Sequence, residues 1–110
     1  MKAIEIINRL NELSITQKTF DWIESLPDDV YKETFMQIPI REITTVGVSE
    51  HRWYENGIIV YEFEEYKGTF FGVNCVTKAY SENSDAEDFC HTLVFYEMEE
   101  IPAVTYQIKM

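Results

Sequence analysis

Cysteine and histidine are the side chains in this sequence that could bind a soft metal or supply a nucleophile. The chain contains Cys75, Cys90, His51 and His91. Structural zinc sites usually take two ligands from one short turn, whereas fifteen positions separate the two cysteines. Cys90 and His91 are adjacent and would point to opposite faces of a strand. A reactive thiolate is disfavoured, because the nearby charge is mostly negative. We therefore predict no metal site, no cofactor and no catalytic residue, with the cysteines buried on neighbouring strands.

Carboxylates are the other candidates for chemistry, since the chain has 20 Asp and Glu against 9 Lys and Arg, a formal net charge of −11. Residues two apart in a strand share a face. Glu62 with Glu64, and Glu97 with Glu99, could therefore form acid–base pairs of the kind that glycosidases use. In so acidic a chain such pairs arise from composition, and a small carboxylate-based enzyme is kept only as an alternative.

Four carboxylates crowd the polar segment 82–88, which contains Glu82, Asp85, Glu87 and Asp88. Their spacing and the lack of a central glycine do not fit an EF-hand calcium loop. We interpret the segment as a solvated loop, with an acidic lobe that faces a partner and a weak calcium site as the alternatives.

The negative charge also restricts the class of partner. Direct binding to a nucleic acid or to an anionic membrane would bring like charges together. Opposite fields speed association, so a basic protein surface is the favoured partner. The N-terminus predicts no signal peptide, and no apolar run reaches the ~20 residues of a membrane span. Two cysteines make no disulfide framework, and we expect a cytoplasmic protein.

Aromatic residues are concentrated in the second part of the chain, where twelve of the sixteen follow Pro39. One sheet face under one helical layer cannot easily bury them all, and exposed rings beside carboxylates suit an arginine-rich partner. The alternative, in which the rings fill the core and stack across strands, stays open. We predict a partner-binding surface with two aromatic anchors and seven carboxylates: Trp53, Tyr66, Glu62, Glu64, Asp85, Glu87, Asp88, Glu97 and Glu99.

The elements that position these residues change character at Ile38-Pro39. In residues 1–38 apolar side chains recur at helical spacing, which predicts a layer of two or three helices. We expect the first over 3–13, a second over 14–26 that begins at a capping-box spacing, and a third that begins at Pro27-Asp28-Asp29.

Residues 39–110 follow a period of two, which predicts an antiparallel sheet of four to five strands in a single α+β domain, 1–110. Asn56-Gly57 tolerates positive φ and predicts a type I′ turn that joins strands over 51–55 and 58–64. The other strands are expected over 40–46, 69–80, 89–98 and 103–109, with turns at 66–68 and 99–102. The helices would cover one sheet face and leave the other, aromatic and acidic, open to solvent or a partner.

Several of these strand sequences resemble a set of small proteins encoded by phages and integrated mobile elements. The resemblance covers about the last sixty residues. It rests on four segments, namely Glu50-His51-Arg52-Trp53-Tyr54, Ile59-Val60-Tyr61-Glu62-Phe63, Phe70-Phe71-Gly72-Val73, and the run from Glu97 that closes on Thr105-Tyr106. It transfers no catalytic residue. It implies a setting, because accessory phage genes often encode small acidic inhibitors of host defence, including anti-CRISPR proteins that imitate DNA.

These patterns together predict a non-enzymatic acidic binding protein. It would occupy a basic, nucleic-acid-binding site of a host defence complex in the host cytoplasm. The first alternative is a homo-oligomeric phage accessory protein, whose open sheet face pairs with a second copy to form a homodimer. The carboxylate-based enzyme is the second alternative.

Overall fold

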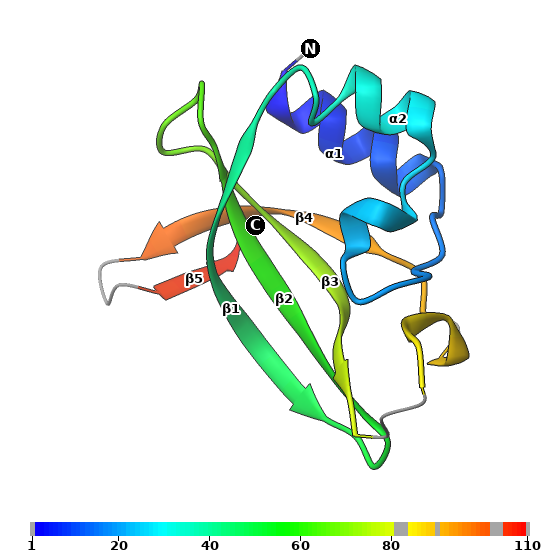
Figure 1. Cartoon of the computed structure of the whole chain (residues 1–110). Helices are drawn as coiled ribbons and strands as arrows, with labels where there is room; N and C mark the ends of the chain where they lie inside the picture. The colour runs from blue at the N-terminus through cyan, green and yellow to red at the C-terminus, as the bar shows by residue number, and fades with distance from the viewer. Residues whose placement is uncertain (1, 81–83, 90, 102–104, 110) are drawn as a thin grey trace.

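The computed structural model describes residues 2–80, 84–89, 91–101 and 105–109, in which helices come first and strands follow (Figure 1). The helical elements are α1 (Ala3–Glu12), the 3-10 helix η1 (Trp22–Ser25), α2 (Asp28–Glu33) and a second 3-10 helix, η2 (Ala86–Phe89). The strands are β1 (Ile40–Glu50), β2 (Tyr54–Phe63), β3 (Phe70–Ala79), β4 (Val94–Ile101) and β5 (Thr105–Ile108). The predicted α+β class is confirmed. No helix in the described part of the chain combines the length and apolarity needed to cross a membrane.

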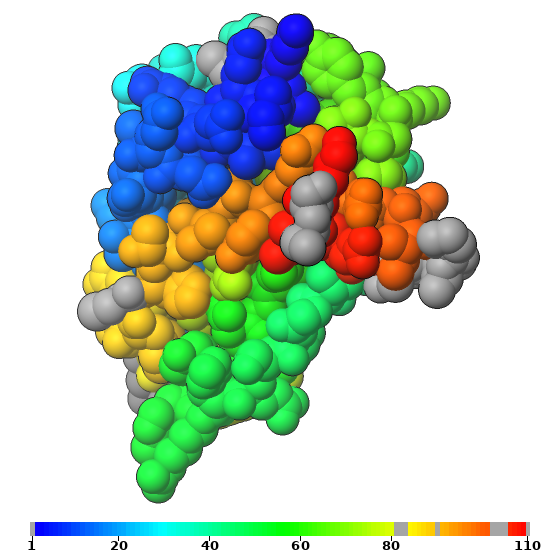
Figure 2. Space-filling view, turned by 180° about the vertical axis from the view of Figure 1, so that it is seen from behind, coloured from blue at the N-terminus to red at the C-terminus, as the bar shows by residue number. Residues whose placement is uncertain are grey.

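The five strands form one antiparallel sheet in the order β1-β2-β3-β4-β5, so each strand pairs with its neighbour in sequence. The predicted antiparallel sheet is therefore confirmed. β4 and β5 turn across the back of β1, β2 and β3 rather than extending them in one plane (Figure 1; seen from behind in Figure 2). Because of this curl, the sheet has an apolar cluster on each face.

The helices pack against one face of the sheet and bury the larger cluster. The indole of Trp22 in η1 lies at its centre. It meets four rings edge-on, with ring centroids 5.5 to 6.4 Å away, and these belong to Phe35, Tyr61, Phe71 and Phe95. The indole Nε1 also donates a 2.8 Å hydrogen bond to the hydroxyl of Tyr61. A buried indole usually needs such an acceptor, so this bond fixes η1 against β2.

The opposite face carries a smaller apolar cluster around the buried side chains of Val60, Phe70 and Met98. β5 contributes to its cover, because the ring centroid of Tyr106 lies 5.0 Å from that of Phe70. The centre of this face is therefore closed, and it is not the open aromatic and acidic surface that the sequence predicts. The curl allows a sheet of this size to bury rings on both sides.

The helix predicted over 14–26 does not form. Ser14 has a φ of +48°, and Thr16 makes an isolated bridge with Thr92. Gln17 is fully buried, and its side-chain amide pairs with the N–H and C=O of Val76 at 2.8 and 2.9 Å. These tertiary bonds outweigh the capping-box spacing, and only the four-residue η1 and the six-residue α2 follow α1. In the described residues, one helix exceeds two turns, instead of the predicted two or three.

The turn predicted at Asn56-Gly57 is also wrong, because both residues lie inside β2. The chain reverses over residues 51–53, where the N–H of His51 donates to the C=O of Tyr54 at 2.8 Å. A Cβ on Gly57 would lie 3.1 Å from Cγ2 of Thr45. The glycine therefore relieves a close approach between β1 and β2 rather than turning the chain.

The boundaries of later elements also differ from the predicted ones. Residues 86–88, predicted as part of a loop, form η2 together with Phe89, where a strand was predicted to start, and β4 begins only at Val94. Residues 99–101 continue β4 rather than turning. The turn at 66–68 is confirmed, with Gly68 at a φ of +86°. Glu82, Cys90 and the predicted strand start at Ala103 lie outside the described residues.

Candidate partner-binding site

The two predicted aromatic anchors lie at opposite ends of β2. Trp53 precedes this strand and Tyr66 follows it, and the two side chains are 60% and 44% exposed. A strand of ten residues spans about 33 Å at ~3.3 Å per residue. The structure therefore does not bring Trp53 and Tyr66 into one surface.

Three predicted carboxylates lie in or beside η2, namely Asp85, Glu87 and Asp88. They share the Trp53 end of the sheet, because the ring of Phe89 in η2 packs against that of Tyr54 with centroids 4.6 Å apart. The carboxylate of Asp88 accepts a 2.7 Å hydrogen bond from the N–H of Asp85, and that of Asp85 accepts one of 2.7 Å from the N–H of Ala86. Two of the three carboxylates thus stabilise their own turn.

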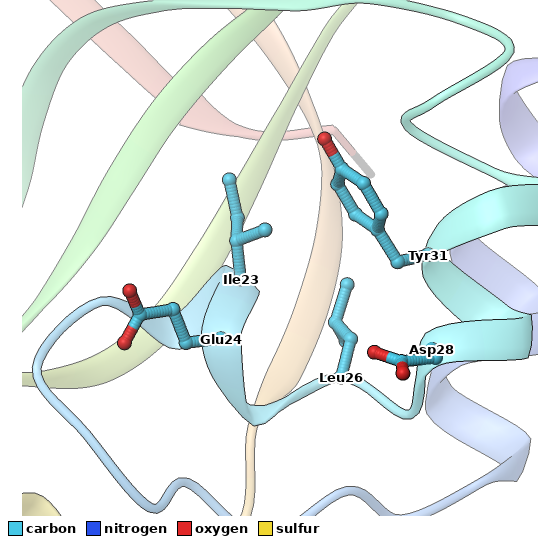
Figure 3. A pocket seen from close by; sticks show the side chains of 5 residues that line it. All are labelled: Ile23, Glu24, Leu26, Asp28 and Tyr31. Carbon is cyan, nitrogen blue, oxygen red and sulfur yellow. The ribbon is translucent and has the colours of Figure 1, made fainter.

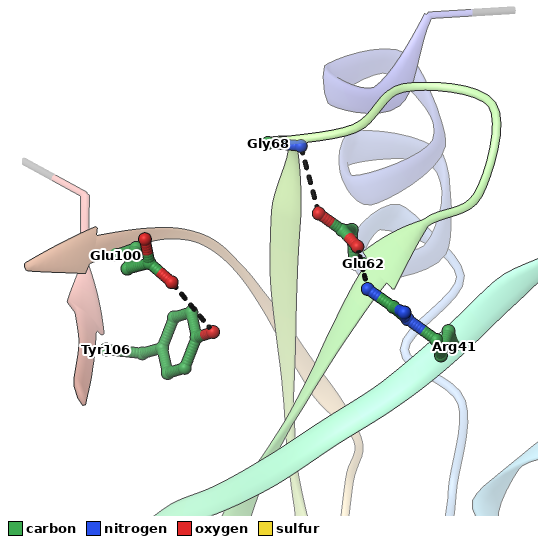
Figure 4. Close-up of polar contacts among 5 residues, drawn as sticks. All are labelled: Arg41, Glu62, Gly68, Glu100 and Tyr106. Atoms are coloured by element: carbon green, nitrogen blue, oxygen red, sulfur yellow. Dashed lines mark hydrogen bonds and ion pairs between the residues drawn. The ribbon is translucent and has the colours of Figure 1, made fainter. Parts of the chain in front are cut away.

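At the other end of β2, Glu62 and Glu64 lie beside two cations. Glu62 forms an ion pair with Arg41 and accepts a 3.0 Å hydrogen bond from the N–H of Gly68 (Figure 4). The Gly68 N–H first, and then Arg41, lower the pKa of the Glu62 carboxyl below its usual value. Arg41, Glu62, Glu64 and Lys67 line an open hollow of about 430 Å³. Two carboxylates and two cations line the hollow, so the charges of its lining balance.

The carboxylates of β4 hold β5 in place. Glu97 pairs with Lys109 at 3.2 Å, and Glu99 accepts a 2.6 Å hydrogen bond from Nε2 of Gln107. The hydroxyl of Tyr106 donates to Glu100 at 3.3 Å (Figure 4). Glu97 and Glu99 therefore have partners within the sheet. By register, Glu97 lies level with the Glu62 end of β2, with β3 between them.

Cysteine and histidine form no reactive cluster among the described residues. Burial, with a smaller contribution from Glu42, raises the pKa of the Cys75 thiol to about 12. The thiolate is the nucleophilic form of cysteine, so this side chain is inert near neutral pH. Nε2 of His91 lies 3.3 Å from Oδ1 of Asn74, and burial lowers the pKa of the His91 imidazole. Within the same residues, no group of three His, Cys, Asp or Glu side chains is placed to hold a metal ion.

A groove between η1 and α2 was not expected from the sequence (Figure 3). It has a volume of about 250 Å³ and is lined by Ile23, Glu24, Leu26, Asp28 and Tyr31. Ile23 and Tyr31 rise on either side of Leu26 (Figure 3). The carboxylate of Asp28 lies on the Tyr31 side, and that of Glu24 points outward beyond Ile23 (Figure 3). The groove thus has an apolar floor and a carboxylate at each end.

Local hydrogen bonds shape this groove. Oδ1 of Asp21 caps η1 by accepting a 3.2 Å bond from the N–H of Ile23. Leu26 donates its N–H to the C=O of Ile23 at 3.1 Å, which closes the 3-10 turn. Pro27 is the N-cap residue of α2, and its C=O accepts from the N–H of Tyr31 at 3.0 Å. The sharp bend between η1 and α2 places Ile23 opposite Tyr31.

The two charged residues that line this groove, Glu24 and Asp28, are both acidic. Residues 20–31 contain Asp21, Glu24, Asp28 and Asp29 and no Lys or Arg. Lys18 and Lys32 lie just outside this segment of the sequence. The ion pairs between described residues use carboxylates elsewhere, namely Glu33, Glu55, Glu62 and Glu97. In the sequence, the groove is marked by this acidic segment around Pro27, which contains no Lys or Arg. The Pro27-Asp28-Asp29 pattern alone indicates only a helix start, and side-chain spacing does not reveal a bend.

Comparison with protein-family models, with curated proteins and with solved structures finds no match to this chain.

Proposed function

We propose that this protein is a small, non-enzymatic acidic binding protein, which occupies a basic, nucleic-acid-binding surface of another protein in the cytoplasm. The partner docks on the groove between η1 and α2. The resemblance of the strand sequences to phage and mobile-element proteins supports a host defence complex as this partner. The protein would then inhibit the complex as an anti-CRISPR protein does, by imitating DNA.

One observation carries the proposal, namely a groove with an apolar floor, two carboxylates and no cation in its lining. Carboxylates can take the place of phosphates opposite Lys and Arg, because both anions form charge-assisted hydrogen bonds. The floor formed by Ile23 and Leu26 adds apolar area that a partner can remove from water. The net charge of −11 would steer a basic surface toward the protein.

The charges at the hollow beside Glu62 support binding rather than catalysis. A carboxylic acid that donates a proton near neutral pH needs a raised pKa, whereas the contacts of Glu62 lower the pKa of its carboxyl. Glu62 therefore does not have the properties of the proton-donating acid of a carboxylate-based enzyme.

A displacement assay tests the proposed function. A fluorescent DNA duplex is bound to a short basic peptide in which arginine alternates with glycine, and the protein is added while fluorescence anisotropy is followed. We expect the protein to take the peptide and release the DNA at low ionic strength. The release should weaken steeply as salt is raised, because exposed charges are screened over ~10 Å at 0.1 M salt. Absence of release at low salt, or release that is indifferent to salt, would contradict the proposal. A control without peptide should show no binding of the protein to DNA.

Self-association is a second candidate, favoured by exposed apolar side chains at the end of the β1–β2 hairpin. Val48, Trp53 and Tyr80 are each about half exposed or more. The N–H of Tyr80 donates to the C=O of Trp53 at 3.0 Å, so these two rings flank the same strand end. The free edge of β1 is a poorer interface, because its pairing register shifts after Glu42 and after Val46, and such irregularities oppose edge-to-edge pairing. A stable dimer in light scattering would favour this candidate, and a monomer would favour the inhibitor.

A further inference from the structure

The groove also indicates which part of a basic partner it holds. We propose that it anchors one arginine side chain of the partner. The methylene stem of this arginine lies on Leu26, and its guanidinium lies between the ring of Tyr31 and the carboxylate of Asp28. This inference rests on the proposed function and adds the chemical identity of the contact.

The size of the groove favours a single side chain as its occupant. Its volume of about 250 Å³ is below the ~300–1,000 Å³ of pockets that enclose small-molecule ligands. It equals about eight water volumes at ~30 Å³ each. An α-helix is about 10–12 Å wide with its side chains and would only lie across the opening. One long side chain, in contrast, can enter.

The floor of the groove suits an aliphatic stem. Leu26 is buried and Ile23 packs against the main core, so both side chains are held in place by the fold. Long cationic side chains cover apolar surface with their methylene groups while their charged ends reach polar groups. A short polar side chain would leave the apolar floor of the groove exposed to water.

The Tyr31 side of the groove distinguishes arginine from lysine. Asp28 and Tyr31 are three positions apart on α2, a spacing at which helical side chains are neighbours. The ring of Tyr31 is 36% exposed and rises above the level of the Asp28 carboxylate, which lies beside Leu26 on the same side of the groove (Figure 3). A planar guanidinium can stack on an aromatic face while its edge donates two hydrogen bonds to a carboxylate. A lysine ammonium is a compact, strongly hydrated charge and does not match this geometry.

Glu24 contributes at the other end of the groove. Its carboxylate points outward beyond Ile23, away from Tyr31 (Figure 3). It is therefore placed to attract a second cation next to the anchored arginine. Charges at the edge of an interface chiefly affect the association rate and the orientation of the partner.

The test compares two peptides of equal length and charge by isothermal titration calorimetry at low ionic strength. Arginine alternates with glycine in one peptide, and lysine alternates with glycine in the other. We expect wild-type protein to bind the arginine peptide about 3- to 10-fold more tightly, on the scale of one cation–π contact with one charge-assisted hydrogen-bond pair. In Tyr31→Leu, which keeps an apolar side chain, this preference should shrink to below about twofold.

A matched pair of variants separates the site from overall charge. Asp28→Asn and Asp29→Asn each remove one negative charge from the first turn of α2, but only Asp28 lines the groove. Asp28→Asn should lower the affinity for the arginine peptide at least about threefold more than Asp29→Asn does. Melting curves of each variant verify that the fold is retained.

The two proposals fail in different ways. Equal affinity of wild-type protein for both peptides would overturn the arginine anchor while leaving an acidic binding protein intact. Equal losses in Asp28→Asn and Asp29→Asn would do the same. If neither peptide binds at low salt, the proposed function and the arginine anchor both fail.

Discussion

Replacing Gln17 with alanine should destabilise the fold by several kcal/mol. This side chain is fully buried. Its amide oxygen accepts from the N–H of Val76 at 2.8 Å, and its amide nitrogen donates to the C=O of Val76 at 2.9 Å and to that of Thr19 at 3.0 Å. The pairing of β3 with β4 ends at Asn74 and Val94. Gln17 thus takes the place of a neighbouring strand just beyond that point.

The size of the loss follows from the groups that alanine leaves behind. The N–H and the C=O of Val76 would both be buried without a partner, and each such group costs about 1–3 kcal/mol. The two together amount to about 2–6 kcal/mol, against a total stability of about 5–15 kcal/mol for a small domain. The segment that leads into η1 would also lose its attachment to β3, so the groove should loosen in this variant.

Urea unfolding followed by tryptophan fluorescence measures this loss, because Trp22 is buried and reports on the main core. Gln37→Ala is the matched control, since it makes the same truncation at an exposed residue. This control should change the free energy of unfolding by less than about 0.5 kcal/mol. A free energy of unfolding for Gln17→Ala equal to that of the wild type would refute the role assigned to Gln17.

Three further predictions test the cores. Tyr61→Phe removes the acceptor of the Trp22 Nε1–H, so the free energy of unfolding in urea should fall by about 1–3 kcal/mol; an unchanged value would show that the indole does not need this bond. In Gly72→Ala the new Cβ would lie 2.5 Å from Cγ2 of Ile58, so the variant should lose about 1–3 kcal/mol in thermal unfolding. Adding Ile58→Ala should recover part of this loss, and purely additive losses would count against the clash. Burial raises the pKa of the Tyr61 hydroxyl from 10.0, and that of the Cys75 thiol from 9.0, to about 12 in the folded protein. The folded state therefore holds these protons more tightly than the unfolded state does. Neither group should change the melting temperature below about pH 9, and the melting temperature should fall between about pH 9 and 12 as both groups lose their protons more readily in the unfolded chain. A melting temperature that stays constant over this alkaline range would show that both groups are solvated.

The fold class could be predicted from the sequence because it depends on local patterns. Helical spacing before Pro39 and a period of two after it separate the helices from the sheet, and each strand pairs with the next one in the chain. The errors arose where distant contacts decide the local structure. Gln17 is not helical because its side chain forms hydrogen bonds with the backbone of Val76, 59 positions away. Gly57 lies inside a strand, where it pairs with Cys75 of β3, 18 positions later.

The candidate site was less predictable than the fold. The sequence marks acidic and aromatic residues, but it does not show which carboxylates meet a cation. Glu62 meets Arg41, 21 positions earlier, and Glu97 meets Lys109, 12 positions later. The groove depends on the bend at Pro27, which places side chains from two short helices around one hollow. Neither helix is long enough to give a strong periodic signal, since η1 has four residues and α2 has six.

The central claim is that basic ligands dock between η1 and α2, and a titration followed by two-dimensional amide NMR tests it most directly. The isotope-labelled protein is titrated with the arginine–glycine peptide at low salt, and the amides whose signals move are mapped onto the chain. We expect the largest shifts to cluster within residues 21–31. Shifts that centre on Trp53 and η2, or that spread evenly over the acidic residues of the whole surface, would contradict it.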